Sequence, residues 1–93
     1  MPTCCRFTVS GRVQGVFFRA STHDKAQQLG INGWVRNTRK GKVELLACGK
    51  PENIEELKNW LWQGPKFAKV TDVESTVLSD VYGMEGFEVR RDG

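Results

Sequence analysis

Two short segments hold most of the residues whose types and spacing suggest chemistry. Residues 11–19 read GRVQGVFFR, and residues 33–41 read GWVRNTRKG. The first is typical of a strand, a glycine-containing loop and the start of a helix. Glycines let such a loop fold so that several backbone N–H groups converge, and a helix N-terminus adds the positive end of a dipole. The pattern predicts an anion site, and Arg19 at its rim favours a phosphoryl group.

The loop does not have the spacing of a nucleotide-binding loop. Neither G-x-x-x-x-G-K-[ST] nor G-x-G-x-x-G occurs, and no Mg²⁺-binding hydroxyl or acid follows it. Taken alone, a Gly-x-x-x-Gly loop before an arginine is a weak signal, which a plain strand–loop–helix junction would also explain.

Taken together, the two segments closely resemble the hallmarks of the acylphosphatase family. These are a G-x-V-Q-G-V-x-F-R loop and a G-W/Y-V/A-x-N strand end followed by a glycine hairpin, and both occur here in that order. The resemblance continues through ACG at residues 47–49, GP at 64–65 and GFEVR at 86–90. It implies hydrolysis of the carboxyl-phosphate bond of acyl phosphates, without a metal or a cofactor.

The resemblance also implies the site residues. The catalytic pair would be Arg19 and Asn37. Arg19 offers a charged fork that binds two oxygens, and the Asn37 amide both donates and accepts, so that it can orient a water for in-line attack. Gly15 is expected to need a positive φ or a close approach of phosphate, and Phe17, where many relatives carry glycine, is expected to narrow the mouth of the pocket. The phosphate would lie in the loop of Gln14, Gly15, Val16, Phe17, Phe18 and Arg19.

The shortage of acids near either segment agrees with this chemistry. The nearest acidic residue to the loop is Asp24, in the helix expected to follow it. A carboxylate leaving group has a pKa of about 4 and departs unprotonated, whereas the alkoxide of a phosphate monoester normally needs an acid or a metal. Phosphoryl transfer needs mainly positioning and charge stabilisation, and the phosphate oxygens can accept the proton of the water. The sequence therefore favours acyl phosphates over phosphate monoesters.

The hydrophobic pattern predicts the elements that position these residues. Apolar alternation indicates strands at 4–9, 31–37, 43–48 and 68–77 and a short strand at 87–89, with a phase slip between Val70 and Val73 that suggests a bulge. Helical spacing indicates helices at 18–29 and 51–63. The order β-α-β-β-α-β, with one extra short strand, predicts an α+β ferredoxin-like sandwich: an antiparallel sheet with two helices on one face.

Composition limits the function classes. The 93 residues suit one domain, 1–93, with one core, and a net charge of +3 suits a small anionic substrate but is too slight to argue for nucleic acid. No apolar signal region or run of transmembrane length occurs, so we expect a soluble, cytoplasmic protein without membrane contact. A monomer is expected because the domain is small. The single histidine, His23, and the absence of C-x-x-C spacing argue against a metal site.

Inorganic phosphate or sulfate is the expected competitive ligand.

The three cysteines fall on different faces of the predicted sheet. Cys5 alternates with Phe7 and Val9 and is expected to be buried and inert. Cys4 faces the other side, where the ferredoxin-like order brings it near Cys48. A disulfide between Cys4 and Cys48 is conceivable, but two reduced thiols are favoured because the expected compartment is cytosolic.

Two other function classes stay open. RNA-binding modules of similar topology stack bases on aromatic side chains of two central strands, where this chain offers only Phe7 and Trp34 and no RNP1 signature. The other class is an idle anion-binding domain, or a regulatory domain of the kind fused to larger carbamoyl-transfer proteins. Intact Arg19 and Asn37 argue against an idle domain. The physiological acyl phosphate stays open.

Overall fold

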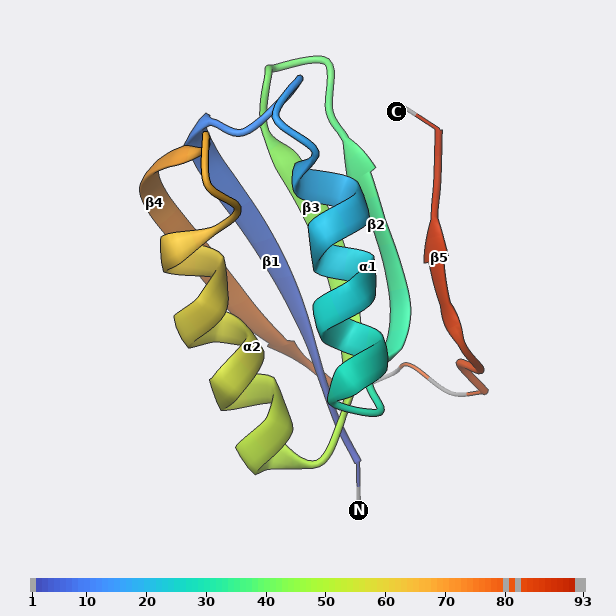
Figure 1. The fold of residues 1–93 in the computed structure, drawn as a ribbon. Helices are drawn as coiled ribbons and strands as arrows, with labels where there is room; N and C mark the ends of the chain where they lie inside the picture. The colour runs from blue at the N-terminus through green and yellow to red at the C-terminus, as the bar shows by residue number, and fades with distance from the viewer. Residues whose placement is uncertain (1, 80, 82, 92–93) are drawn as a thin grey trace.

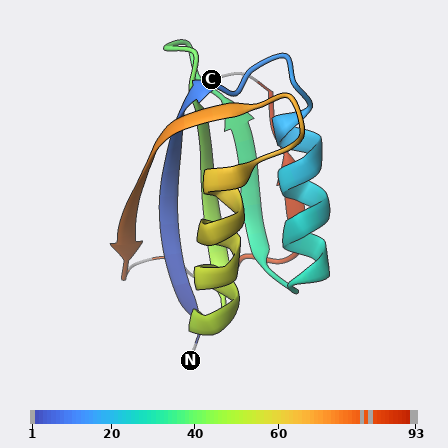
Figure 2. The same cartoon turned by 60° about the vertical axis from the view of Figure 1, so that its left-hand side comes forward.

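A computed structural model describes residues 2–79, 81 and 83–91 of the chain. Both helices lie on one face of a single five-stranded sheet (Figure 1, Figure 2). This is the two-layer ferredoxin-like α+β arrangement predicted from the sequence. The elements are β1 (Thr3–Arg12), α1 (Phe18–Gln28), β2 (Asn32–Asn37), β3 (Val43–Gly49), α2 (Pro51–Gln63), β4 (Lys69–Leu78) and β5 (Phe87–Val89).

The sheet has the strand order β4-β1-β3-β2-β5 and is mixed rather than wholly antiparallel. The pairs β1–β3, β1–β4 and β2–β3 are antiparallel as predicted, but β5 pairs with β2 in parallel. The reason is the path of the chain. β4 ends and β5 begins at the same end of the sheet but on opposite edges, so β5 runs against β4 and therefore along β2.

The main core lies between the sheet and the two helices. Alternate residues of β1 face the helices, as the period of two predicts. Each helix contributes one buried stripe, and the C-cap of α1, Leu29, packs against the core as a partly buried residue. The core includes Cys5, Phe7 and Val9 of β1, Phe18 and Ala26 of α1, and Ile54, Leu57 and Leu61 of α2.

A bulge lies where β1 approaches the first functional segment. Ser10 pairs with Asp72 but Gly11 pairs with Val70, which leaves Thr71 as the extra residue of β4. The predicted phase slip between Val70 and Val73 is thereby confirmed. Because the strand that carries the extra residue bends and twists, the bulge turns the start of β4 beside the end of β1.

Three connections meet at one end of the molecule, at the top of Figure 1. They are the β1–α1 loop, the β2–β3 hairpin and the segment between α2 and β4. The two sequence segments with suggestive chemistry therefore come together there. Among the residues that the structure describes, no helix is both long and apolar enough to cross a membrane.

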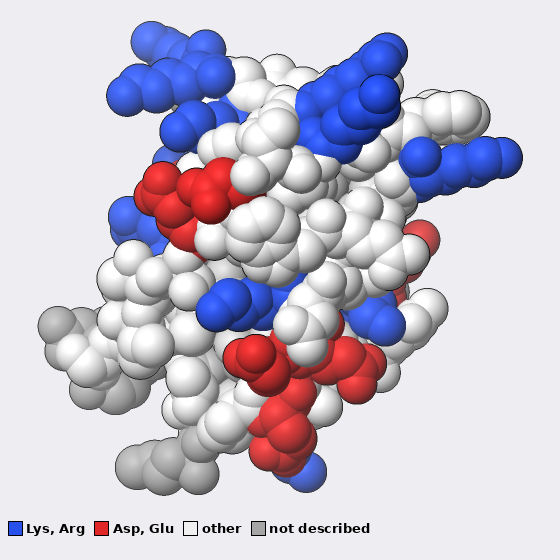
Figure 3. All heavy atoms as spheres, turned by 90° about the vertical axis from the view of Figure 1, so that its left-hand side faces the viewer, with Lys and Arg blue, Asp and Glu red and all other residues white. Residues whose placement is uncertain are grey.

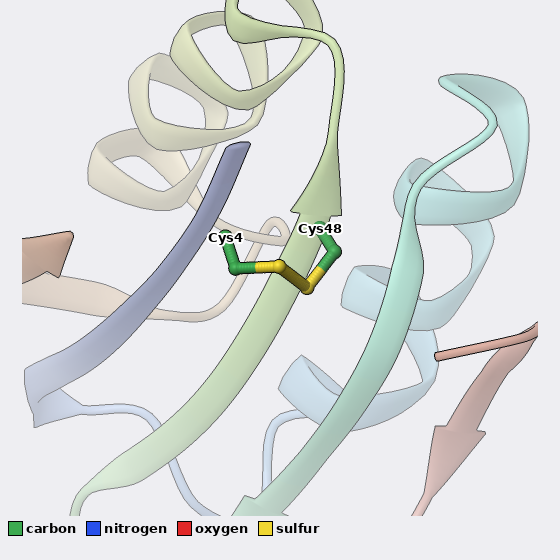
Figure 4. Close-up of a disulfide and its surroundings, with 2 residues drawn as sticks. All are labelled: Cys4 and Cys48. Carbon is green, nitrogen blue, oxygen red and sulfur yellow. A yellow bond between two sulfur atoms is a disulfide. The ribbon is translucent and has the colours of Figure 1, made fainter. Parts of the chain in front are cut away.

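The outer face of the sheet carries a second, smaller apolar cluster, in which Cys4 and Cys48 are buried beside Leu46. Cys4 and Cys48 are direct partners in the β1–β3 register, with Cα atoms 4.0 Å apart. The structure joins them in a disulfide (Figure 4). It therefore departs from the favoured expectation of two reduced thiols, because the register brings the two sulfur atoms within bonding reach.

Loss of this disulfide should destabilise the fold. The bond joins residues 44 positions apart, and restricting the unfolded chain in this way is worth roughly 2–4 kcal/mol. We expect a reductant to lower the Tm of the oxidised protein by about 8 °C or more, at about 4–8 °C per kcal/mol for a domain of this size. Thermal scans with and without dithiothreitol measure this. The control is Cys4→Ala/Cys48→Ala, whose Tm should not respond. An equal response from both proteins would contradict the prediction.

The third cysteine lies on the other face, as strand alternation predicts. Cys5 is a free thiol buried in the main core. Burial raises the pKa of the Cys5 thiol above its usual value, an effect that the nearby Lys58 opposes. A protonated, enclosed thiol is a poor nucleophile.

Candidate active site

The β1–α1 loop, residues 13–17, takes its shape from two residues with positive φ. Gly15 has φ 73° and Phe17 has φ 62°. A Cβ added at Gly15 would meet no atom within 4 Å, so the space around it is open. Its positive φ is a backbone conformation that L side chains rarely adopt, and this by itself favours glycine at the position.

The N-terminus of α1 adjoins this loop, and no side chain in its first turn offsets its positive charge. Phe17 is the N-cap, makes no side-chain capping hydrogen bond, and precedes a first turn that contains no acidic residue. The first N–H groups of a helix lack intrahelical partners and form the positive end of its dipole. This end of α1 is therefore well suited to an anion.

Arg19 lies in the first turn of α1 and is held from the far end of the chain. Its Nη1 donates to the backbone carbonyl of Arg90 at 3.3 Å. Arg90 is itself fixed, because its N–H donates to the carbonyl of Val35 in β2 at 2.8 Å. No pattern in the sequence predicts this contact, because it requires β5 to add to the edge of β2.

Asn37 is the last residue of β2 and faces the helices. Only 8% of it is exposed, and no hydrogen bond joins its side chain to another residue of the described chain. Its neighbour Arg36 faces the opposite side, as alternation predicts, and forms hydrogen bonds of 2.9 and 2.7 Å with Glu44. The Asn37 amide is therefore available to a ligand or a water, whereas Arg36 is not directed at the same place.

Gln14 connects the two segments directly. Its Nε2 donates to the carbonyls of Thr38 at 2.8 Å and Lys42 at 2.9 Å, both in the β2–β3 hairpin. These bonds hold the β1–α1 loop beside Asn37, which immediately precedes Thr38. The side chain predicted to lie among the phosphate-binding residues thus has a positioning contact in the structure.

A cleft of about 390 Å³ lies between these elements, at the lower end of the range for small-molecule sites. It brings Gly15, Phe17, Phe18 and Arg19 together with Asn37, and it is completed by Val13, Ala20 and Val89. Of the other predicted loop residues, Gln14 points to the hairpin and Val16 is buried in the core. Within the described part of the chain, no three His, Cys, Asp or Glu residues cluster as metal ligands would.

Replacing Phe17 should reveal the strain in the loop. Phe17 is 79% exposed, so its side chain gains little from burial, while a left-handed backbone costs a non-glycine residue roughly 1–2 kcal/mol. Glycine removes that cost but gives up about 0.4–1 kcal/mol to the entropy of the unfolded chain. We expect Phe17→Gly to raise the free energy of unfolding by about 0.5 kcal/mol in urea titrations. Phe17→Ala keeps the strain and is the matched control; a glycine variant less stable than the alanine variant would contradict the account.

Comparison with known proteins identifies the family and agrees with the fold. The acylphosphatase family model matches residues 5–89. The chain is 52% identical to an acylphosphatase of Nitrosococcus oceani, covering 97% of this chain and all of that protein. The chain belongs to the acylphosphatase family.

Solved structures show the same relationship. An acylphosphatase from Coxiella burnetii superimposes with a TM-score of 0.91 and 47% identity, covering 96% of this chain and 93% of that one. An acylphosphatase from Bacillus subtilis superimposes with a TM-score of 0.92 and 34% identity, covering 97% and 99%.

Proposed function

We propose that this chain hydrolyses the carboxyl-phosphate bond of small acyl phosphates, releasing a carboxylate and inorganic phosphate. The observation that carries the proposal is the cleft in which Arg19, Asn37 and the uncapped start of α1 meet. Membership of the acylphosphatase family, whose relatives carry that name, supports it.

In the proposed mechanism, the N–H groups of the β1–α1 loop and the guanidinium of Arg19 bind the phosphoryl oxygens. The amide of Asn37 orients a water in line with the bond to be broken. The water oxygen bonds to phosphorus as the bond from phosphorus to the carboxyl oxygen breaks, and that electron pair leaves on the carboxylate. A phosphate oxygen takes the proton. One acyl phosphate dianion and one water thus become one carboxylate and one dihydrogen phosphate.

The lining of the cleft favours this substrate class. Among the described residues that line it, none carries a carboxylate, imidazole or thiol that could protonate a leaving group. A carboxylate needs no such help because its conjugate acid has a pKa of about 4. The described lining residues also include no donor set of the kind that holds Mg²⁺, and the proposed mechanism contains no metal step.

An assay with benzoyl phosphate in the presence of EDTA tests the proposal. We expect hydrolysis to continue at an unchanged rate, and p-nitrophenyl phosphate to be a very poor substrate. Inorganic phosphate should inhibit competitively, because the product fits the same loop. Loss of activity on chelation, with recovery on addition of Mg²⁺, would contradict the metal-free mechanism.

The RNA-binding alternative loses its stacking surface. Phe7 is 1% exposed in the core, so its ring cannot receive a base. Trp34 lies on the outer face, and the guanidinium groups of Arg36 and Arg90 lie over its ring, 5.1 and 4.9 Å from the ring centroid. We keep a monomer as the expected form, because the proposed mechanism calls on no residue of a second copy.

A further inference from the structure

A second cleft, also of about 390 Å³, lies on the other side of the β1–α1 loop. It shares Gly15 and Phe17 with the first cleft, so the two clefts adjoin. Its remaining walls are Arg12 and Val16 on one side and residues 66–69, between α2 and β4, on the other. The proposed mechanism gives no role to this second cleft.

Three cations line the second cleft without an ion-pair partner in the described part of the chain: Arg12, Lys66 and Lys69. Arg12 and Lys69 are also direct partners in the β1–β4 register. Like charges directly opposite one another destabilise a sheet, so the arrangement works against the fold unless an anion lies between them. Figure 3 shows Lys and Arg side chains gathered along the upper end of this face, and Asp and Glu mixed with other Lys and Arg side chains below them.

Two aromatic rings at the same place are exposed to solvent. Phe17 is 79% and Phe67 66% exposed, and both line the second cleft. The Nζ of Lys66 lies 5.6 Å from the centroid of the Phe67 ring. Apolar surface rimmed by charge is typical of a ligand-binding groove. The rings suit the body of an organic group, and the cations suit its charged end.

The geometry of in-line displacement indicates which reacting group each cleft would hold. The attacking water and the leaving group lie on opposite sides of the phosphorus. Asn37, proposed to orient the water, lines the first cleft, whereas Lys66 and Lys69 line the second, across the loop. A phosphoryl group held by the loop would therefore direct its acyl group towards the second cleft.

We propose that the second cleft binds the acyl group, and that the preferred substrates are acyl phosphates whose acyl group ends in a second anion, either a carboxylate or a phosphate. Arg12, Lys66 and Lys69 bind this anion, and the rings of Phe17 and Phe67 contact the body of the acyl group. The inference rests on the proposed function, since it assigns the substrate class of the same site.

Matched substrates test the inference. The anionic probes are 4-carboxybenzoyl phosphate and 4-phosphonobenzoyl phosphate, and 4-carbamoylbenzoyl phosphate is the neutral probe of similar size. The readout is the kcat/KM of each anionic probe divided by that of the neutral probe. Lys66→Gln/Lys69→Gln should lower this ratio about fivefold, which corresponds to the upper range for partly exposed charge pairs. The anionic probe with the higher ratio in the unaltered protein identifies the favoured anion.

The control variant is Lys50→Gln/Lys58→Gln, which removes the same amount of charge. Lys50 is the N-cap of α2 and Lys58 lies within this helix, and neither lines one of the two clefts. Its ratio should equal that of the unaltered protein. If all three probes are hydrolysed and the ratio is the same in both double variants, the inference is overturned and the proposed function stands. If the unaltered protein does not hydrolyse the neutral probe, the proposed function fails, and this inference fails with it.

The unaltered protein provides a second measurement that needs no substitution. Exposed charges are screened by salt, with a Debye length that falls from about 30 Å at 0.01 M to about 3 Å at 1 M ionic strength. The anionic-to-neutral ratio should therefore fall as salt is added, since the phosphoryl group is common to all probes. A ratio that does not change with salt would overturn the inference.

Discussion

Arg19→Gln is expected to lower kcat/KM for benzoyl phosphate by about 10³-fold or more, as removal of an arginine from a phosphoryl-transfer site commonly does. Arg19 lies in the first turn of α1, in the cleft with Asn37, and its Nη1 is held by the carbonyl of Arg90. A guanidinium fixed in this way can bind two phosphoryl oxygens through charge-assisted hydrogen bonds. Glutamine removes the charge and the fork. Steady-state kinetics measure the loss.

Phosphate binding separates lost affinity from lost folding in this variant. A ligand at about 100 times its Kd stabilises the fold by about 2.7 kcal/mol, so phosphate should raise the Tm of the unaltered protein by roughly 10 °C or more. Arg19→Gln should lose most of this shift. Arg19→Lys is the matched control for charge, and it should also fail because an ammonium group cannot form the bidentate contact. An active lysine variant would contradict the role given to the fork.

Asn37→Ala is expected to lower kcat by about 10²–10³-fold while the inhibition constant of phosphate stays close to that of the unaltered protein. A reduction of this size is typical when an enzyme loses one group that forms a hydrogen bond in the transition state. The phosphate affinity should survive, because the proposed anion contacts come from the β1–α1 loop and Arg19, and Asn37 is assigned to the water. Kinetics with phosphate as a competitive inhibitor measure both quantities.

The carboxylate variant Asn37→Asp is the control for this assignment. It keeps the shape of the side chain but adds a negative charge beside the proposed phosphate, so it should lose phosphate affinity as well as turnover. If Asn37→Ala retained full activity, or lost phosphate affinity as completely as Arg19→Gln, a water-orienting role for Asn37 would be wrong.

Much of the fold follows from local patterns in the sequence. The alternation of Cys5, Phe7 and Val9 predicts which face of β1 is buried, and the spacing of Phe18, Thr22 and Ala26 predicts the buried side of α1; the structure confirms both. Period two and period 3.6 are properties of the elements themselves, so neighbouring residues report them.

Other features depend on contacts between segments far apart in the sequence. The parallel pairing of β5 with β2, and with it the contact between Arg19 and the Arg90 carbonyl, follows from the path of the chain after β4. The hydrogen bonds of Gln14 to the hairpin require two loops to meet in space. Phe17 has a left-handed backbone conformation, which a phenylalanine rarely adopts. Its residue type therefore does not predict this conformation.

The disulfide shows the difference between a feature that the sequence pattern predicts and one that it does not. Alternation and strand order were sufficient to bring Cys4 towards Cys48, and the register of β1 on β3 makes them direct partners. The expected oxidation state rested on the compartment, which no local pattern measures. The closeness of the two cysteines was therefore predictable from the sequence, whereas their oxidation state was not.

Hydrolysis of benzoyl phosphate in water enriched in ¹⁸O tests the central claim most directly, because it shows which atom the water attacks. If a water at Asn37 attacks phosphorus held by the β1–α1 loop and Arg19, the label enters inorganic phosphate, where ³¹P NMR detects its isotope shift, and the benzoate remains unlabelled. Label in the benzoate would place the attack at the carbonyl carbon and would contradict the proposed mechanism.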